Sequence, residues 1–323
     1  MDTHDYRIDR LRILACFGVV LLHSSAGTGA GYDDLALNAL FRFSVPVFVL
    51  ISGWFQLCVP VPFNRMVRKC SLLFWKLLLW SGLYLLARLI FWDLWPEDIL
   101  TWLLTQPVHL WYLYATMGLY LLTPALYPFV RSAEKGEYRY ALAVCFCLGC
   151  VVVTLVRLNW LPVMAVILDK SKLPDMLGFV FLYLLGGWFR RFGFGSKKHW
   201  LCVGILSSML SILSIFTPYD QQLLSFISPN VVLAGASCFA LCMTAKPPSK
   251  GQQPILYRCA ECTMGIYLLH PLVSSLVTPL LEPVRGMLLP SAAMLLRCVC
   301  IIAISFGIIW LLTLCKPLRK YAL

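Results

Sequence analysis

Long apolar runs recur from one end of the chain to the other, separated by short polar stretches. A run of about 18 residues with few charges can cross a hydrocarbon core of roughly 30 Å as a helix. Because a bilayer offers the backbone no water to bond, helices are the expected element. The pattern predicts ten spans, at approximately residues 9–26, 36–58, 70–92, 107–130, 140–156, 175–189, 199–216, 229–245, 255–281 and 287–315.

These spans follow one another without a soluble domain, a long linker or an internal repeat. The sequence therefore predicts an all-α integral membrane protein, a single bundle of about ten transmembrane helices in one domain, residues 1–323. Composition agrees, because 60% of the residues are hydrophobic and 13% are charged. A water-soluble fold could not bury that much apolar surface.

The net charge of +12 is distributed unevenly along the chain. It would indicate a nucleic-acid partner only if it formed a basic face on a soluble module, so we expect no nucleic acid and the lipid bilayer as the first partner. With a cytoplasmic N-terminus, 19 of the 27 Lys and Arg residues fall in inside segments, four in outside loops and four within spans. This excess predicts that both termini are cytoplasmic.

Arg12 and His23 are the most informative polar residues of the first predicted span. They are eleven residues apart, close to three helical turns, so they share one helix face about 16 Å apart along its axis. An imidazole titrates near neutral pH and suits general-base catalysis. A lone histidine in a membrane helix can equally serve as a hydrogen-bond donor to a neighbour, and the residue pattern leaves both interpretations open.

Three further arginines lie at or within predicted spans. Arg42 enters the second span from the outer side, where it either snorkels to the surface or stabilises an oxyanion or an anionic acceptor beside His23. Arg65 and Arg68 are spaced i, i+3 at the cytoplasmic start of the third span. They are either ordinary flanking charges or a phosphate site for a cytoplasmic nucleotide or coenzyme.

Other residues that could carry chemistry are fewer. His109, Tyr267 and His270 are polar groups in or beside predicted spans, and a structural role is favoured for each. Two Cys-x-x-Cys pairs, Cys147/Cys150 and Cys259/Cys262, are more than a hundred residues apart and lie within helices, so we expect no metal site. The sequence contains no Gly-rich phosphate loop and no zinc-helix motif, and it suggests no Ser-His-Asp triad.

Five stretches, taken together and in order, resemble the membrane-bound acyltransferase-3 family. They are Ile8-Asp9-Arg10-Leu11-Arg12 followed by an apolar run to His23-Ser24, Arg42-Phe43-Ser44-Val45-Pro46 running to Ser52-Gly53, Arg65-x-x-Arg68, His109-Leu110-Trp111-Tyr112-Leu113, and Gly265-Ile266-Tyr267-Leu268-Leu269-His270-Pro271. Each stretch is short, but together they span nearly the whole chain.

The resemblance implies transfer of an acyl group, usually acetyl from acetyl-CoA, to a hydroxyl of a cell-surface glycan or its lipid-linked precursor in the inner membrane of a bacterium. Acetyl-CoA is then a co-substrate, and no bound cofactor is expected. In the family the Arg and His of the first helix are needed for activity and the Arg-x-x-Arg pair is assigned to the acyl-CoA, roles that carry over to Arg12, His23, Arg65 and Arg68.

Many members of the family carry an added extracytoplasmic domain that passes the acyl group onward. This chain ends shortly after the tenth predicted span. We therefore expect it either to acylate its acceptor directly or to transfer the group to a separate extracytoplasmic partner.

Two mechanisms and a second function stay open at this point. His23 acts as a general base on the acceptor hydroxyl or forms an acyl-histidine intermediate, with Arg42 or a backbone donor at the oxyanion. Ser52, Tyr267 and His270 are further candidates for the oxyanion or acceptor site. The alternative function is a transporter or flippase for a glycan or lipid, in which the intramembrane His and Arg line a path.

Overall fold

The computed structural model describes residues 4–25, 31–92, 98–105, 108–161, 174–285 and 287–315, and this part of the chain contains helices and no strand. The α-helices are α1 (Tyr6–Ser24), α2 (Tyr32–Phe41), α3 (Ser44–Gln56), α4 (Phe63–Trp92), α5 (Ile99–Thr105), α6 (Trp111–Ser132), α7 (Lys135–Phe146), α8 (Val153–Arg157), α10 (Pro174–Phe192), α11 (Lys197–Ser214), α12 (Asp220–Leu223), α13 (Pro229–Met243), α14 (Gln253–Arg285) and α15 (Pro290–Thr313). A 3-10 turn η1 (Val108–Leu110) precedes α6, and a π-helical turn η2 (Cys147–Val152) joins α7 to α8.

Every predicted span coincides with a helix or with consecutive helices of this bundle. Within the described residues, six segments are long and apolar enough to cross a membrane: Tyr32–Gln56, Phe63–Ile90, Trp111–Ser132, Lys135–Arg157, Gln253–Val284 and Pro290–Thr313. The other four predicted spans correspond to α1, α10, α11 and the shorter apolar helix α13. The all-helical membrane architecture is confirmed, and the count of ten crossings stays a prediction.

The second predicted span is interrupted rather than continuous. It consists of α2 and α3, with a break at Arg42 and Phe43. Pro46 explains the position of the break, because proline has no N–H for the carbonyl of residue 42 and its ring clashes with that carbonyl in a continuous helix. The first bond of the new helix instead runs from the Val47 N–H to the Phe43 carbonyl at 3.1 Å. Arg42 is therefore held at a helix break within the bundle.

Close backbone contact joins α3 to α10. A Cβ atom on Gly53 would lie 1.9 Å from the carbonyl oxygen of Tyr183, and one on Gly186 would lie 2.2 Å from the carbonyl oxygen of Leu50. Only glycine allows the two helices to approach this closely. The contact forms the centre of one of two large buried apolar clusters, and α1, α14 and α15 contribute to the other.

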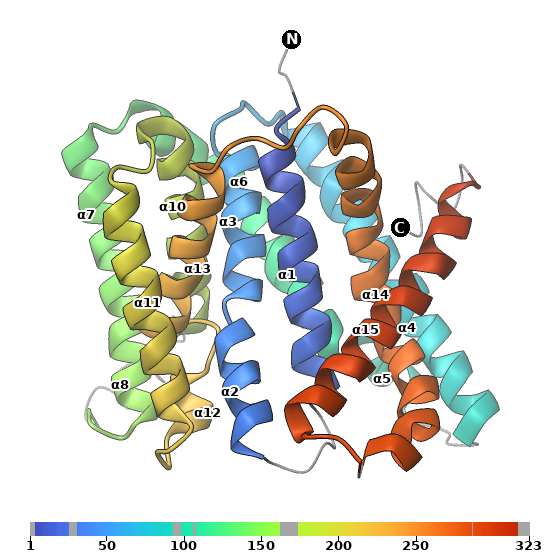
Figure 1. Cartoon of the computed structure of the whole chain (residues 1–323). Coiled ribbons are helices and arrows are strands. Elements are labelled where there is room, and N and C mark those ends of the chain that lie inside the picture. The colour runs from blue at the N-terminus through green and yellow to red at the C-terminus, as the bar shows by residue number, and fades with distance from the viewer. Residues whose placement is uncertain are drawn as a thin grey trace.

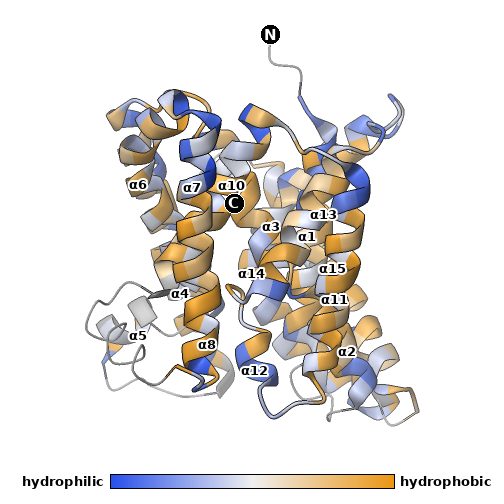
Figure 2. Ribbon diagram, turned by 90° about the vertical axis from the view of Figure 1, so that its left-hand side faces the viewer, coloured by the Kyte–Doolittle hydropathy of each residue, from blue (hydrophilic) through white to orange (hydrophobic). Residues whose placement is uncertain are grey.

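Hydrophobic residues occur along most of the length of the helices, as the orange ribbon of Figure 2 shows. Large exposed hydrophobic residues occur on α4, α11, α14 and α15, among them Leu86, Ile90, Leu206, Leu280 and Leu311. In water such a surface would drive association, whereas lipid tails solvate it.

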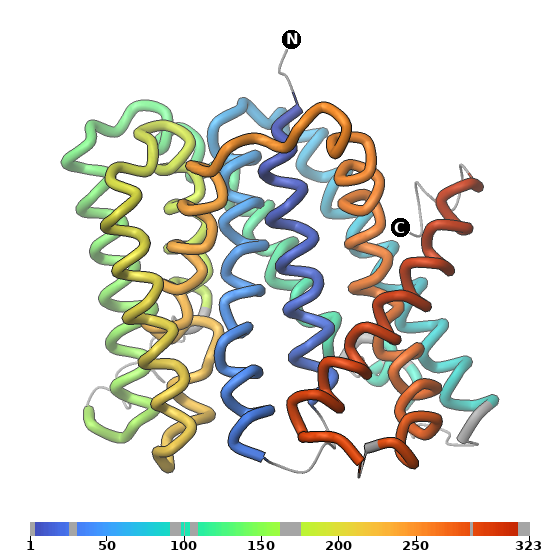
Figure 3. Tube along the Cα trace, in the orientation of Figure 1, coloured from blue at the N-terminus to red at the C-terminus, as the bar shows by residue number. Residues whose placement is uncertain are grey.

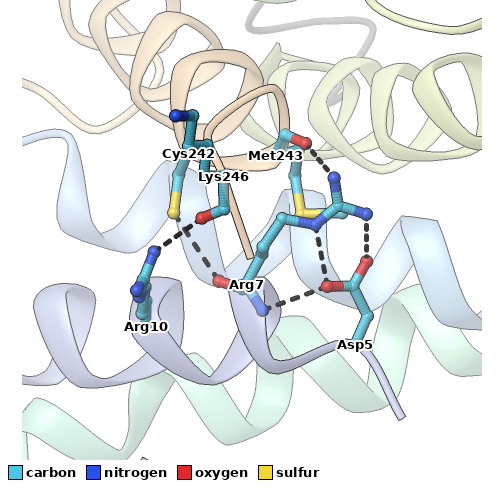
Figure 4. A network of polar contacts seen from close by, with 6 residues as sticks. All are labelled: Asp5, Arg7, Arg10, Cys242, Met243 and Lys246. Atoms are coloured by element: carbon cyan, nitrogen blue, oxygen red, sulfur yellow. Dashed lines mark hydrogen bonds and ion pairs between the residues drawn. The ribbon is translucent and has the colours of Figure 1, made fainter. Parts of the chain in front are cut away.

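The start of α1 is bonded to the end of α13, as Figure 4 shows. Arg7 donates to the carbonyl of Met243 at 2.6 Å, and Arg10 donates to the carbonyl of Lys246 at 3.0 Å. Asp5 caps α1 and accepts from the Arg7 side chain at 2.9 and 2.8 Å. Figure 3 shows the connection from α13 to α14 passing over this end of α1. Carbonyls at a helix C-terminus lack partners within the helix and attract cations, so the two arginines stabilise this junction.

The helix ends that carry the predicted inside charges lie together at the upper end of Figure 1. They are the start of α1, the end of α3 with the start of α4, the end of α6 with the start of α7, the end of α10 with the start of α11, the end of α13 with the start of α14, and the end of α15. The last predicted inside charges, Lys316, Arg319 and Lys320, lie outside the described residues. The assignment of this end to the cytoplasm stays a prediction.

Candidate functional site

A cavity of about 510 Å³ lies within the bundle, and we call it the histidine cavity. Its lining includes five of the sequence-predicted site residues: Arg12, His23, Arg42, Ser52 and Tyr267. They come from α1, the break before α3, α3 itself and α14, so the fold brings together residues that are up to 255 positions apart. Aromatic side chains supply much of the remaining wall, namely Phe48, Trp111, Tyr112, Tyr120 and Phe226.

A second cavity, of about 390 Å³, adjoins the first, and we call it the Arg65 cavity. The two share four lining residues, Arg12, Ile51, Ser52 and Tyr120. Arg65 and Lys69 line the second cavity near the start of α4. The two cavities therefore adjoin, one lined by Arg65 and Lys69 toward the basic end of the bundle and the other lined by His23.

Three imidazoles meet at the inner end of the histidine cavity. The ring centroid of His270 lies 5.1 Å from that of His23 and 5.6 Å from that of His109. His23 is exposed and lines the cavity, whereas His270 is completely buried and His109 is 7% exposed. The sequence left the three histidines separate, on the first, fourth and ninth predicted spans, and the packing of α1, η1 and α14 joins them.

The tautomer of His270 follows from its hydrogen bonds. Its Nδ1 lies 2.7 Å from the carbonyl oxygen of Tyr267 and 3.3 Å from that of Ile266. A carbonyl can only accept, so Nδ1 carries the proton and Nε2 of the neutral ring is an acceptor. Among the described residues, neither this Nε2 nor the buried Nε2 of His109 has a hydrogen-bond partner. Two unpaired buried nitrogens beside a cavity are unusual, since each costs about 1–3 kcal/mol.

Arg42 is held over the cavity by its neighbours on α1 and α2. Its Nε donates to Oδ1 of Asn38 at 3.0 Å, one helical turn earlier. The amide of Asn38 in turn donates to Ser25 Oγ at 2.7 Å, two residues after His23. The Arg42 guanidinium also lies over the ring of Phe226 at 5.5 Å. This arrangement keeps the cation beside His23 instead of letting it extend freely to the surface.

Arg12 is positioned by a carboxylate that the sequence pattern did not single out. Asp9 is 1% exposed, and its Oδ1 lies 3.8 Å from an Arg12 nitrogen. Its Oδ2 lies 2.6 Å from His4 Nε2. The Arg12 guanidinium lies over the ring of Phe55 at 5.5 Å. Asp9 and Phe55 therefore orient the Arg12 side chain, which lines both cavities.

The remaining predicted residues are placed differently. Ser52 lines both cavities, and the Tyr267 hydroxyl donates to the backbone carbonyl of His109. His270 lies behind His23 and is not part of the cavity lining. Arg68 is exposed and lines neither cavity. The assignment of Arg68 to acyl-CoA stays a prediction.

Sequence reasoning missed some residues of the site and left others without a role. Lys69 lines the Arg65 cavity, and its Nζ donates to Gln56 Oε1 at 2.8 Å. The sequence groups Lys69 with Arg65 and Arg68 at the start of the third predicted span, but the Arg-x-x-Arg resemblance gives a role only to the two arginines. Asn38 was missed, although it lies four residues before Arg42 and is therefore its neighbour on a helix. Phe226, which follows α12, carries no local pattern that could have placed it in the cavity wall.

Within the part of the chain that the structure describes, no group of three or more His, Cys, Asp or Glu side chains is arranged to hold a metal ion. Cys147 and Cys150 lie on the π-helical turn η2, and Cys259 and Cys262 lie on α14.

Comparison with known proteins gives one match. A family model described as an acyltransferase domain matches residues 5–314 of the 323 residues. No curated protein and no solved structure matches the chain. The match covers both cavities and all the helices that line them, and the chain belongs to the acyltransferase 3 family.

Proposed function

We propose that this protein is a membrane-embedded O-acyltransferase that moves an acetyl group from cytoplasmic acetyl-CoA to a hydroxyl of a glycan or lipid-linked sugar of the cell envelope. The family supports membrane acyl transfer in general. The observation that carries the finer proposal is the pair of adjoining cavities, one lined by Arg65 and Lys69 at the basic end and the other by His23 and Arg42. Such an arrangement suits a donor with a phosphorylated head and a long arm that ends in a thioester.

In this scheme Arg12, Arg65 and Lys69 hold the phosphates of the coenzyme. Arg pairs well with phosphate oxygens, and Lys adds a compact charge. Arg12 and His23 are about 16 Å apart along α1, so an extended pantetheine arm brings the thioester toward His23. The acceptor enters the histidine cavity, whose aromatic wall offers flat surfaces to a sugar ring.

The chemical step then uses the groups beside His23. The unprotonated ring nitrogen of His23 accepts the proton of the acceptor hydroxyl. At the same time the oxygen of that hydroxyl attacks the carbonyl carbon of the thioester. Arg42 stabilises the negative charge that develops on the carbonyl oxygen. The intermediate expels the coenzyme thiolate, which takes the proton back from His23. The products are the O-acyl ester and free coenzyme A, so atoms and charge balance.

His270 positions His23 in this proposal. Its Nδ1 is bonded to backbone carbonyls, its Nε2 is buried without a partner among the described residues, and its ring lies beside the rings of the other two histidines. A small rotation of the exposed His23 ring lets its N–H donate to this acceptor. The other nitrogen of His23 is then free of hydrogen and faces the substrate. The buried acceptor thus selects the catalytic tautomer.

The test uses membrane vesicles from cells that lack the gene and from the same cells complemented with wild-type or variant protein. With radiolabelled acetyl-CoA supplied on the cytoplasmic face, wild-type vesicles should incorporate label into envelope glycan or glycolipid. The His23→Ala variant should lose this activity by at least about a hundredfold. His199→Ala is the matched control, because His199 is exposed on α11 and lines neither cavity. Normal transfer by His23→Ala would show that His23 is not the base.

The same vesicles distinguish the two mechanisms and the transporter alternative. Without acceptor, an acyl-histidine intermediate leaves label on wild-type protein but not on His23→Ala, whereas a general base leaves no label on either. Movement of a glycan across the membrane without any acyl transfer would identify a transporter. For the donor site, Arg65→Gln and Lys69→Gln should raise the KM for acetyl-CoA, and Lys198→Gln, an exposed charge at the same end, should not.

A further inference from the structure

A third cavity of about 320 Å³ lies where α3, α6 and α10 end, and we call it the three-arginine cavity. It is lined by Leu57, Cys58, Tyr127, Val130, Arg131, Arg190 and Arg191, and it shares no lining residue with the histidine or Arg65 cavities. Neither the family match nor the proposed reaction uses it. Its lining is half apolar and half cationic.

Two of the three guanidinium groups are held in place. Arg190 donates to the carbonyl of Trp54 at 3.0 Å and lies over the Trp54 ring at 5.9 Å. Arg191 donates to the carbonyl of Val130 and lies 4.7 Å from the Phe192 ring centroid. Because each guanidinium has five N–H groups and these bonds use one, each keeps donors for another acceptor. Ordered cations are better ligands than mobile ones, since less side-chain entropy is lost on binding.

The simplest explanation for these arginines is that they neutralise the negative C-terminal ends of the helices. If so, the positive charge of the arginines should about equal the negative charge of the helix ends. The C-terminus of a helix carries roughly half a negative charge, or about one and a half for α3, α6 and α10 together. Three arginines supply about three positive charges, because the guanidinium stays protonated. No Asp or Glu lines the cavity, and among the described residues none of the three arginines has a carboxylate at ion-pair distance. The cavity therefore keeps an excess of positive charge.

We propose that the three-arginine cavity binds a phosphate group. Phosphate oxygens accept several charge-assisted hydrogen bonds at once, which matches a pocket of convergent guanidinium donors. The cavity lies at the ends of α3, α6 and α10, and the ends of membrane-spanning helices are where lipid headgroups would meet them. Leu57, Val130 and Tyr127 provide a surface for the apolar part of a ligand. The phosphate comes from an anionic phospholipid or from free phosphate, and both present the same oxygens.

The experiment measures ligand binding to the purified full chain in detergent by native mass spectrometry and by thermal unfolding. The probes are phosphatidylglycerol, phosphatidylcholine and inorganic phosphate, each added separately. Arg131→Gln is the main variant, because Arg131 is exposed and, in the described contacts, makes no bond to a helix-terminal carbonyl. Arg131→Lys keeps the charge. Arg139→Gln removes an exposed arginine of α7 that lies outside the cavity.

We expect wild-type protein to bind phosphatidylglycerol more tightly than phosphatidylcholine, or to bind inorganic phosphate directly. Arg131→Gln should weaken that binding by at least about fivefold, since one charge-assisted contact is lost, while Arg131→Lys and Arg139→Gln should bind nearly as wild type. Binding of phosphatidylglycerol alone identifies the lipid headgroup as the source, and competition by inorganic phosphate identifies free phosphate. Equal binding of both lipids with no phosphate binding, or equal loss in Arg131→Gln and Arg139→Gln, would overturn the proposal.

Discussion

At the scale of single residues, the hydrogen bonding of the His270 ring predicts how two substitutions at this position change kcat. Its Nδ1 is bonded to a backbone carbonyl, and its Nε2 is buried without a partner among the described residues. His270→Asn retains an amide near Nδ1 but has no atom at Nε2, whereas His270→Gln reaches the Nε2 position. If the Nε2 acceptor positions His23, kcat for acyl transfer should fall by about tenfold to a hundredfold in His270→Asn and by a few-fold in His270→Gln.

The KM for acetyl-CoA provides the control for this pair of variants. It should stay near the wild-type value in both, because His270 does not line the Arg65 cavity, where we propose that the donor phosphates bind. A purely structural role would instead reduce stability and activity in parallel in both variants. Equal kcat in His270→Asn and His270→Gln, with equal melting temperatures, would contradict the positioning role.

Residue spacing predicted which side chains share a helix face better than which of them line a cavity. Arg12 and His23 lie on one face of α1 however the other helices pack. The sequence alone therefore predicts that they face a common cavity. Arg65 has neighbours at both i+3 and i+4 on its helix face, namely Arg68 and Lys69. Only the packing of α4 in the bundle, mainly against α6, determines that Lys69 lines the cavity and that Arg68 does not.

At the scale of elements, the crossing of α3 and α10 depends on glycine. A Cβ at position 53 would lie 1.9 Å from the Tyr183 carbonyl oxygen, and that backbone atom cannot move aside as a side chain could. Gly53→Ala should therefore lower the free energy of unfolding by about 1–3 kcal/mol, measured by thermal or denaturant unfolding in detergent. Because α3 carries Ser52 and follows Arg42, activity should fall as well.

Gly82 of α4 provides the matched control. A Cβ at this position meets no atom within 4 Å, and the residue is helical. Gly82→Ala should leave stability unchanged or raise it by up to about 1 kcal/mol, since alanine favours the helix. A Gly53→Ala protein as stable as Gly82→Ala would show that α3 and α10 can separate without penalty.

The junction of α1 with α13 has a testable pH dependence through Asp5. Partial burial raises the pKa of this carboxyl, but hydrogen bonds and charge from Arg7 lower it by more, so its pKa lies below the usual 3.8. A carboxyl whose pKa is lower in the folded state stabilises the fold above the unfolded pKa. That contribution disappears as the pH falls from about 3.8 through the lowered folded value.

Asp5→Asn isolates this charge, because Asn caps a helix as well as Asp does. At pH 7 the variant should be less stable than wild type by up to about 1 kcal/mol, a modest figure because the pair is partly exposed. The difference should shrink as the pH falls below about 3.8 and disappear once the pH lies below the lowered pKa of Asp5 in the folded protein. A stability difference that stays constant from pH 7 to pH 3 would rule out the ion pair as its source.

At the scale of the whole molecule, the alternation of charge predicts topology. The basic helix ends lie together at one end of the bundle, as expected if each long element crosses once. The predicted count of ten crossings depends on α11 and α13, because neither helix is among the six segments that are long and apolar enough to span a membrane by themselves. Fusions placed in the loops before α11, after α11 and after α13 report their crossings.

Green fluorescent protein fused after Gly195 or Gly251 should fluoresce, which requires a cytoplasmic position. Alkaline phosphatase fused after Thr217 should be active, which requires an external one. The reverse pattern would invert the predicted orientation. If green fluorescent protein fused after Thr217 also fluoresced, so that all three positions were fluorescent, α11 and α13 would not cross. Fusions after Gly136 serve as a cytoplasmic reference, because this position follows one of the apolar spans that is not in question.

The sequence by itself determined the helical membrane architecture, the uneven charge and the pairing of Arg12 with His23. Hydrophobicity, loop charge and helical spacing are local properties, and each can be read without knowing which helices touch. Only the tertiary structure decided that His109 and His270 meet His23, that Asn38 holds Arg42 at a helix break, and that Lys69 joins Arg65. These contacts join segments far apart in the chain, and they depend on how closely helices approach and on which face each presents.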